Sequence, residues 1–186
     1  MPDVKKPVLI LLDFAKGYGW LPGSFGYDTV AHVRKLKDAA HAAGVQVIHV
    51  NSMRRETDDL PSPSRLLPGS EAIEVIPELQ PVDKDVIIYK RYLSGFSYND
   101  LDYTLRTMGV DGVIIGGASV DNTVLWTAAD AHQHHYHVVL VDECCICHRE
   151  KEPPGAKEAA FRIAKSVLKA EILSLDDAIG KYLTKR

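Results

Sequence analysis

Three polar residues that could do chemistry stand at the ends of short apolar runs in this 186-residue chain: Asp13 after residues 8–12, Lys90 after 86–89, and Thr123 a few residues after 113–115. A carboxylate can exchange protons, an ammonium group can balance negative charge, and a hydroxyl can attack carbon once a base activates it. Each also has an ordinary structural role as a turn cap, a solvated strand end or a helix cap. Residue type alone favours the ordinary role for Asp13.

The stretch from Gly116 to Ala131 must position Thr123. A short β-branched run leads into this stretch, and two glycines allow a sharp turn. The apolar spacing that follows predicts a helix, which Ser119 or Asp121 can cap. In a parallel α/β sheet such a strand–turn–helix unit places its turn at the carboxyl edge, where ligands bind. The unpaired N–H groups of the new helix point to the same place.

This stretch resembles the nucleophile segment of the isochorismatase-like hydrolases, also called the cysteine hydrolase superfamily, with the pattern Gly-x-x-Thr-x-x-Cys-Val-x-x-Thr-Ala-x-Asp-Ala. Asp13, within Leu-Leu-Asp-Phe, and Lys90 also match the catalytic Asp and Lys of that family, so the resemblance covers nearly the whole chain. It departs at Thr123, where most members carry the nucleophilic Cys. The match to the pattern runs through Gly117, Asp121, Val124, Leu125, Thr127, Ala128, Asp130 and Ala131.

The resemblance implies that Asp13, Lys90 and Thr123 are the catalytic positions. It also implies a cis peptide between Ala118 and Ser119, and an oxyanion hole formed by the backbone amides of Ser119 and Thr123. Thiol members attack an amide or similar carbonyl, whereas isochorismatase proper has Gly at this position, protonates a vinyl ether and adds water. Loss of the thiol fits the second chemistry better, because a secondary hydroxyl is a poorer nucleophile.

We therefore expect a hydrolase of a small anionic metabolite that uses Asp13 and Lys90 for acid–base and electrostatic catalysis, without a Cys nucleophile. One alternative is an amidohydrolase with Thr123 as its nucleophile. Another is a catalytically silent binding or scaffold protein. Arginines near the rim favour an anionic substrate, and aromatic side chains could wall the pocket. The predicted substrate-binding residues are Phe14, Trp20, Asn51, Arg54, Tyr92, Phe96, Tyr98 and Trp126.

Metal-binding residue types are present, but their spacing does not favour a metal site. His132 and His135 could share a helix face, yet the predicted helix ends there, and the group Cys145, Cys147 and His148 fits no common zinc spacing. The nicotinamidase branch of the family holds a metal with Asp and His after its second strand, where this chain has residues 51–54 as Asn-Ser-Met-Arg. We expect no metal and no cofactor.

Composition is typical of a globular α/β protein, with 46% hydrophobic residues, 25% charged residues and a net charge of −3. No basic surplus points to nucleic acid, no apolar run is long enough to span a membrane, and three crowded cysteines indicate a reducing cytoplasm rather than a disulfide framework. The length predicts one domain over residues 1–186. The resemblance implies a homo-oligomer, either a dimer or a tetramer.

Alternating apolar strands and amphipathic helices predict a parallel sheet covered on both sides. The resemblance implies an α/β fold with a three-layer α/β/α sandwich and a mostly parallel six-stranded, Rossmann-like sheet, whose strand order the sequence does not give. We expect a helix over residues 27–43, a short helix near 73–79 in the irregular segment 51–81, a strand over 138–141, and a loop over 144–154. Ser174 and Asp177 predict a helix cap.

Overall fold

The computed structural model of the chain describes residues 4–55, 66–148 and 154–184. These residues form six strands, β1 (Pro7–Leu12), β2 (Val47–Ser52), β3 (Val86–Lys90), β4 (Gly112–Ala118), β5 (His137–Ile146) and β6 (Glu171–Leu173). They also form five α-helices, α1 (Thr29–Ala42), α2 (Leu101–Thr107), α3 (Leu125–Gln133), α4 (Ala156–Ser166) and α5 (Leu175–Tyr182). Residues 56–65 of the irregular segment lie outside the described residues.

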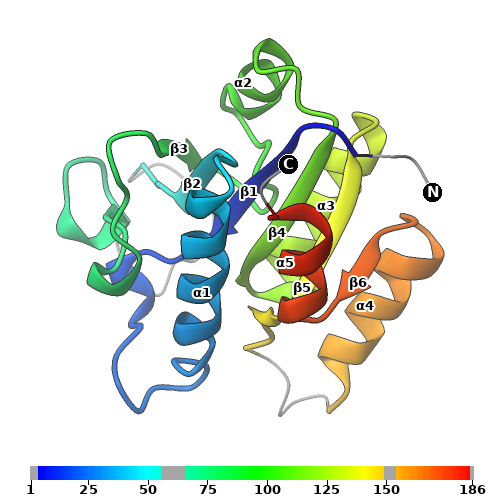
Figure 1. The fold of residues 1–186 in the computed structure, drawn as a ribbon. Coiled ribbons are helices and arrows are strands. Elements are labelled where there is room, and N and C mark those ends of the chain that lie inside the picture. Colours follow the sequence, from blue (N-terminus) through cyan, green and yellow to red (C-terminus); the bar gives the residue numbers. More distant parts are fainter. Residues whose placement is uncertain (1–3, 56–65, 149–153, 185–186) are drawn as a thin grey trace.

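The six strands form one parallel sheet in the order β3-β2-β1-β4-β5-β6. Parallel order follows from the alternation of strands and helices, since a parallel neighbour needs a crossover connection. The carboxyl ends of β3, β2, β1 and β4 are neighbours along one edge (Figure 1). The predicted α/β sandwich with a six-stranded sheet is confirmed.

Helices cover both faces of the sheet, because successive strand side chains point to opposite sides. In β1, Leu9 and Leu11 pack in the cluster that contains the inner faces of α1 and α5. Ile10 and Leu12 pack in the other cluster, with α2, α3 and α4. The described residues thus form three layers with two apolar interfaces, which hold the strand ends in fixed positions.

Three local predictions need correction. Two single 3₁₀ turns, Glu71–Ile73 and Pro77–Leu79, replace the expected short helix. β5 continues to Ile146, so Cys144 and Cys145 lie in a strand rather than a loop. Neither predicted cap bonds to the start of α3, which follows a wide π-type turn over Val120–Val124.

Two other local predictions are confirmed. Ser174 caps α5, because its hydroxyl accepts a hydrogen bond from the backbone N–H of Asp177. The helix over residues 27–43 is present as α1, two residues shorter at its start and one at its end. Within the described residues, no helix is long and apolar enough to cross a membrane.

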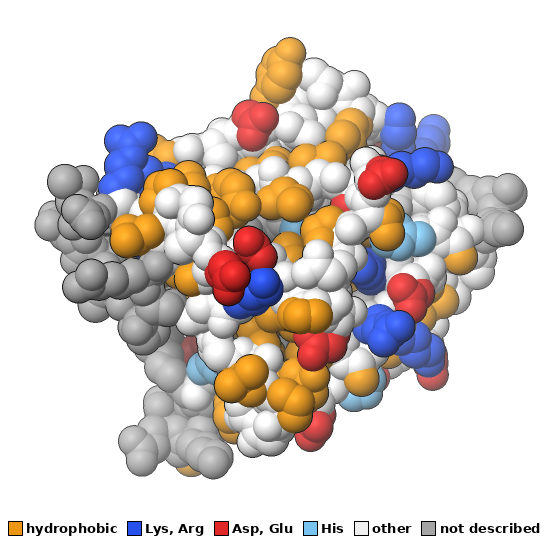
Figure 2. All heavy atoms as spheres, turned by 90° about the vertical axis from the view of Figure 1, so that its left-hand side faces the viewer, with side chains coloured by type: hydrophobic (Ala, Val, Ile, Leu, Met, Phe, Trp, Pro, Cys, Tyr) orange, Lys and Arg blue, Asp and Glu red, His pale blue; other side chains and the backbone are white. Residues whose placement is uncertain are grey.

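The side of the molecule nearest β3 shows hydrophobic side chains interspersed with charged ones (Figure 2). Ile87, in the edge strand β3, is 45% exposed, and Val82 just before the strand is 49% exposed. Mixed surfaces of this kind are ordinary, because folded proteins expose much apolar area. The predicted chemistry lies at the strand ends rather than on this face.

Candidate active site

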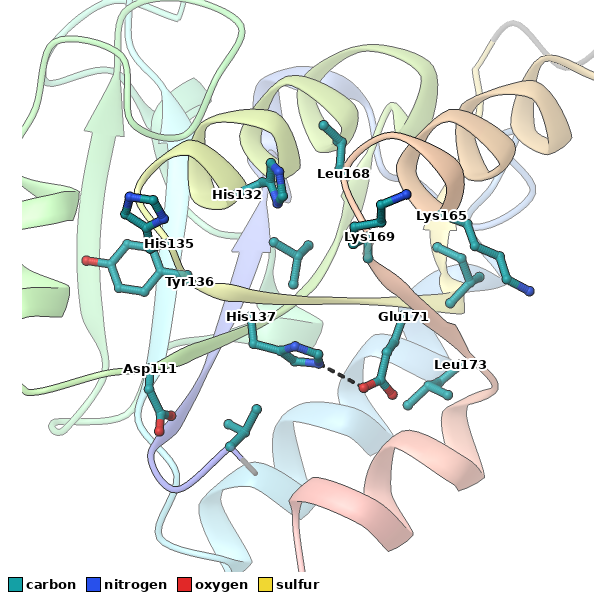
Figure 3. Close-up of a pocket in the computed structure, with 14 residues that line it drawn as sticks. Asp111, His132, His135, Tyr136, His137, Lys165, Leu168, Lys169, Glu171 and Leu173 are labelled. Carbon is teal, nitrogen blue, oxygen red and sulfur yellow. Dashed lines mark hydrogen bonds and ion pairs between the residues drawn. The ribbon is translucent and has the colours of Figure 1, made fainter. Parts of the chain in front are cut away.

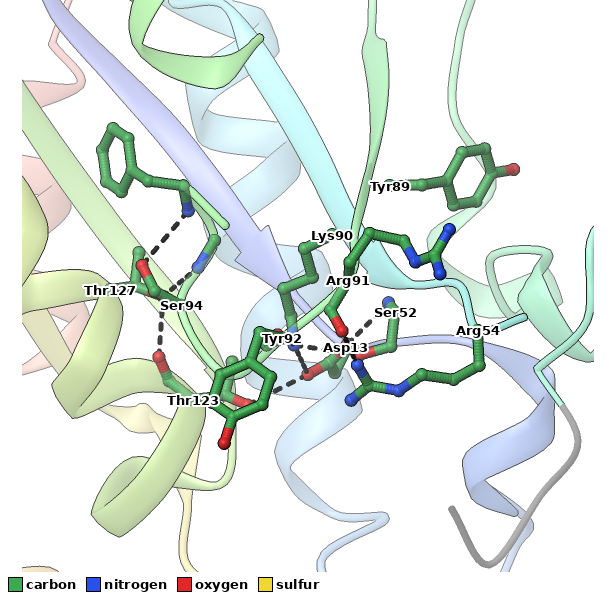
Figure 4. Close-up of polar contacts among 12 residues, drawn as sticks. Asp13, Ser52, Arg54, Tyr89, Lys90, Arg91, Tyr92, Ser94, Thr123 and Thr127 are labelled. Carbon is green, nitrogen blue, oxygen red and sulfur yellow. Dashed lines mark hydrogen bonds and ion pairs between the residues drawn. The ribbon is translucent and has the colours of Figure 1, made fainter. Parts of the chain in front are cut away.

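A buried cluster of polar side chains around one carboxylate lies where the carboxyl ends of four neighbouring strands meet (Figure 4). Asp13 directly follows β1, Ser52 ends β2, Lys90 ends β3, and Thr123 lies in the turn after β4. Their exposed fractions are 4%, 0%, 1% and 5%. The structure therefore brings the three predicted catalytic residues together and adds Ser52, which the sequence analysis missed.

Both carboxylate oxygens of Asp13 accept hydrogen bonds. Oδ1 accepts from the backbone N and from Oγ of Ser52, each at 2.9 Å. Oδ2 lies 3.0 Å from Lys90 Nζ and accepts a hydrogen bond of 3.2 Å from Thr123 Oγ1. A backbone amide and an ammonium group can only donate, so each oxygen has one obligatory donor. This set of donors favours the ionised carboxylate.

Lys90 is held in place by the same network. Its Nζ also donates to Ser52 Oγ at 2.9 Å and to the backbone carbonyl of Tyr92 at 3.1 Å. An ammonium group buried to this degree requires such partners, because an isolated buried charge would cost several kcal/mol, about 3–5 when one partner of a pair is lost. The cluster is therefore a satisfied ion pair with two hydroxyls adjacent to its carboxylate, those of Ser52 and Thr123.

Thr123 is positioned by the start of α3. Thr127 Oγ1 donates to the Thr123 carbonyl at 2.7 Å and accepts from the Gly95 backbone N–H at 2.8 Å, which joins the 91–100 segment to the helix. The peptide bond between Ala118 and Ser119 is cis, as predicted from the resemblance. The oxyanion role of the Ser119 and Thr123 amides stays a prediction.

Two aromatic side chains, those of Phe14 and Trp20, pack beside the backbone of Asp13. Trp20 Nε1 donates to the Asp13 backbone carbonyl at 3.1 Å, and the Trp20 ring lies 5.0 Å from the fully buried Phe14 ring. Asp13 itself has a φ of +62°, which a non-glycine residue adopts only where its surroundings hold it. Phe14 and Trp20 therefore contact the backbone that carries the carboxylate.

Tyr18 is a second residue that the sequence analysis missed. Burial raises the pKa of Tyr18, and the negative charge of the nearby Asp13 raises it further. Its phenol therefore stays neutral and keeps a proton to donate at physiological pH. The only available signal was its position in the loop after β1, because Tyr18 belongs to no motif that the sequence analysis used.

Arg54 lies at the rim, as predicted. Its Nη1 donates to the backbone carbonyl of Arg91, and the Arg54 charge is close enough to lower the pKa of Tyr18 against the larger effect of burial. Its Nε is buried and has no hydrogen-bond partner among the described residues. Asn51 points to the other side of β2, where Nδ2 donates to the Ile73 carbonyl at 3.1 Å.

The remaining predicted substrate-binding residues are more exposed than the cluster or pack against other side chains. Phe96 packs away from Asp13, with its ring 5.2 Å from His134 and 6.3 Å from Tyr136. Tyr98 is 85% exposed, Trp126 54% and Tyr92 45%. Their contact with a substrate stays a prediction, and the backbone carbonyl of Tyr92 accepts a hydrogen bond from Lys90 of the cluster.

His148 lies beside the Ser119 turn. Its backbone N–H donates to Ser119 Oγ at 3.0 Å, its ring lies 5.9 Å from that of Trp20, and Ser119 Oγ also bonds to Asp121. Partial burial lowers the pKa of His148, while the charges of Asp121 and Asp13 act in the opposite direction. The imidazole is therefore neutral at pH 7 and can either donate or accept a hydrogen bond.

The cysteines lie outside this cluster. Cys144 packs in the layer under α1, Cys145 and Cys147 pack in the layer under α3 and α4, and Cys145 Sγ bonds to the Ile115 carbonyl at 3.7 Å. All three are buried and form no disulfide. Among the described residues, no group of three His, Cys, Asp or Glu side chains could hold a metal ion.

The Isochorismatase domain profile matches residues 7–171, which is most of the chain. The chain belongs to the isochorismatase family of hydrolases. Maleamate amidohydrolase of Pseudomonas putida is 27% identical over 82% of this chain and 77% of its own length. Ureidoacrylate amidohydrolase of Acinetobacter baylyi is 28% identical over 76% of this chain and 71% of its own length.

Solved structures of this isochorismatase-family fold superpose closely. N-carbamoylsarcosine amidase of Thermoplasma acidophilum has a TM-score of 0.78 and 26% identity, and the match covers 92% of this chain and 98% of that structure. The family assignment made from the Gly117–Ala131 pattern is therefore confirmed. One domain over residues 1–186 and a homo-oligomeric state stay predictions.

Proposed function

We propose that this isochorismatase-family hydrolase cleaves an amide-type C–N bond in a small anionic molecule, with Asp13 as the proton-transfer group, Lys90 as its counter-charge and no thiol nucleophile. The observation that carries the proposal is the set of donors around Asp13, one obligatory donor on each oxygen. An ionised carboxylate serves as a base, whereas vinyl-ether cleavage would require it to start as an acid. This geometry therefore favours cleavage of an amide over cleavage of a vinyl ether, which the sequence alone favours.

In the proposed reaction, Asp13 removes a proton from a water molecule while the water oxygen adds to the carbonyl carbon of the substrate. Asp13 then gives that proton to the departing nitrogen as the C–N bond breaks. Lys90 keeps its proton throughout and stabilises the negative charge that develops. Burial strengthens this interaction, because charges 3.0 Å apart and shielded from water interact more strongly than at a surface. Thr123 Oγ1 holds Oδ2 in place.

The preference for an anionic substrate is supported by Arg54. Its guanidinium is fixed by the Arg91 carbonyl, and its buried Nε has no hydrogen-bond partner among the described residues. A substrate carboxylate would supply that partner and a charge-assisted bond. The relatives named for maleamate and ureidoacrylate act on small carboxylates, which agrees with this assignment.

One observation favours a second candidate function, an amidohydrolase in which Thr123 attacks the carbonyl. Thr123 Oγ1 already donates to Asp13 Oδ2 at 3.2 Å, the contact that a base needs to activate a hydroxyl. That route forms an acyl ester on Thr123 before water releases it. Ser52 Oγ also donates to Asp13, but Lys90 and complete burial fix it as a structural member of the network.

The test is a panel of maleamate, ureidoacrylate, N-carbamoylsarcosine and isochorismate, with ammonia or product release measured for the parent and for Asp13→Asn. Each carboxylate is compared with its methyl ester. We expect turnover of at least one amide-type carboxylate, weaker turnover of its ester, and loss in Asp13→Asn. Turnover of isochorismate alone would contradict the amide assignment, and tight binding without turnover of any compound would favour the binding or scaffold protein.

A further inference from the structure

A cavity lies at the opposite edge of the sheet from Asp13 (Figure 3). Its wall includes His137 and Glu171, the first residues of β5 and β6, whereas Asp13 follows the last residue of β1. The ends of α3 and α4 complete it. Its volume of about 860 Å³ lies within the range of small-molecule sites. Nothing in the proposed hydrolytic reaction uses this cavity.

The acidic groups in the cavity wall already have partners. Asp111 accepts the backbone N–H groups of Lys5 and Lys6, each at 2.9 Å. Glu171 accepts from Tyr182 at 2.9 Å and from Lys181 at 2.6 Å, and its Oε1 lies 2.8 Å from His137 Nε2. Burial opposes the Glu171 charge, but these donors outweigh it and hold the pKa below its usual value.

Four basic side chains in the wall have no charged partner among the described residues. His132 and His135 come from the end of α3, and Lys165 and Lys169 come from the end of α4. Among the described residues, none of these four forms an ion pair with a carboxylate, and Lys169 donates only to the Ser166 carbonyl, at 2.7 Å. The side chains of these four residues therefore keep hydrogen-bonding capacity for an anion.

Two of these four basic residues, His135 and Lys169, have a positive φ, which non-glycine residues adopt uncommonly. His135, after α3, has a φ of +70°, and Lys169, after α4, has a φ of +56°. Helices commonly end with Gly at such left-handed positions. The same chain does so at Gly44 after α1 and at Gly109 after α2, with φ of +71° and +67°. The chain departs from glycine at the two helix ends that line this cavity.

We propose that this cavity binds a small organic anion, a carboxylate or a phosphate attached to an apolar ring. Lys169, Lys165 and the two histidines would face the anionic group, while Val138, Leu168 and Ile172 contact the ring. A ligand of this class explains why side chains that can carry charge replace glycine at both left-handed positions. The site lies across the sheet from the catalytic cluster and is independent of it.

The test uses 2-naphthoate and 1-naphthyl phosphate as anionic probes and 2-naphthalenemethanol as the neutral probe, with calorimetric titration of the full chain at low salt. We expect the anions to bind and the alcohol to bind at least about tenfold more weakly. His135→Gly and Lys169→Gly should each weaken anion binding about two- to fivefold, as for exposed charge pairs, and together about tenfold. The better probe identifies the anionic group.

Stability measurements keep the test falsifiable. Glycine relieves the left-handed strain, so both variants should unfold at an equal or higher urea midpoint while they bind less anion. Tyr98 is exposed, has a φ of +57° and does not line the cavity, so Tyr98→Gly is the matched control and should keep full anion affinity. Asp13→Asn should also keep it. Equal binding of the alcohol, full affinity in the double glycine variant, or loss in Asp13→Asn would overturn the proposal.

Discussion

Two buried carboxylates, Asp13 and Asp85, are held in opposite ways. Their side chains are 5% and 1% exposed. Asp13 lies 3.0 Å from a lysine ammonium and accepts bonds from two hydroxyls and an amide. Asp85 lies 2.8 Å from His41 Nε2 and 3.5 Å from His49 Nε2, and accepts the Val82 backbone N–H at 3.1 Å. The partner of Asp13 is thus an ammonium-bearing side chain, whereas the partners of Asp85 are imidazoles.

Under the proposed function, the difference separates a site for chemistry from a site for stability. Burial lowers the pKa of His49 to about 4, so this imidazole is neutral at pH 7. Asp85 precedes β3 and joins it to α1, away from the carboxyl edge. Asp13 lies at that edge, beside a hydroxyl and near Arg54. Under the proposed function, burial alone does not mark a catalytic carboxylate, whereas its position and a fixed positive partner do.

Activity should separate the two carboxylates most strongly. Asp13→Asn should lower kcat/KM by about two to four powers of ten, because an amide can neither take nor return the proton. Asp85→Asn should change it less than about threefold in the fraction that is folded. Steady-state rates on an amide substrate, with circular dichroism to confirm folding, make the comparison. Equal losses would mean that position at the edge does not matter.

Removal of the lysine should destabilise the fold. Lys90→Met should lower the free energy of unfolding by about 3–5 kcal/mol, because it leaves the Asp13 charge buried without its partner. Lys37, whose Nζ donates at 2.6 Å to the Gln80 carbonyl beside the Asp85 cluster, is the control, and Lys37→Met should cost about 1 kcal/mol. Urea denaturation measures both. A smaller loss in Lys90→Met than in Lys37→Met would contradict the buried ion pair.

The histidine cluster should make stability depend on pH. The folded-state pKa of His49, about 4, lies below its unfolded value of about 6.5, so the unfolded chain takes up this proton first as pH falls. The free energy of unfolding should therefore fall by about 3 kcal/mol from pH 6.5 to pH 4 and then level off for this group. His49→Gln should lose that part of the slope. An unchanged slope would mean that His49 does not resist protonation.

Alkylation should have the smallest effect. Burial raises the pKa of Cys145 to about 12, and it also raises the pKa of Cys144, so neither is a thiolate at neutral pH. Iodoacetamide should leave the rate of amide hydrolysis unchanged while a control thiol enzyme is inactivated. Inactivation that substrate prevents would show that a cysteine takes part in the reaction.

Much of the fold could be predicted from the alternation of apolar strands and amphipathic helices. The length of β5 could not. The polar pair Asp142 and Glu143 interrupts its apolar run, and the register shift that follows Ile115 restores pairing at Gly117 with Cys145. Where β5 ends therefore depends on its pairing with β4, and the local sequence of β5 holds no information on that pairing.

The three residues predicted to be catalytic could be placed from the resemblance, but the residues that hold them in position could not. Ser52 ends a strand and gives no local sign that its amide and hydroxyl bind Asp13 across the sheet. Phe96 lies six residues after Lys90, yet the intervening chain turns its ring toward His134 and Tyr136. Both depend on how distant segments pack, so sequence spacing alone does not determine them.

The central claim is that Asp13, rather than a covalent nucleophile, carries the reaction. Its most direct test is kcat/KM of Thr123→Ala beside Asp13→Asn on the best amide substrate, with mass spectrometry of the parent during turnover. Loss of the Thr123 hydroxyl removes one hydrogen bond of 3.2 Å, which should cost about 1 kcal/mol, less than about tenfold in rate. We predict a loss under tenfold in Thr123→Ala and no adduct. A loss as deep as that of Asp13→Asn, with an acyl group trapped on Thr123, would contradict the claim.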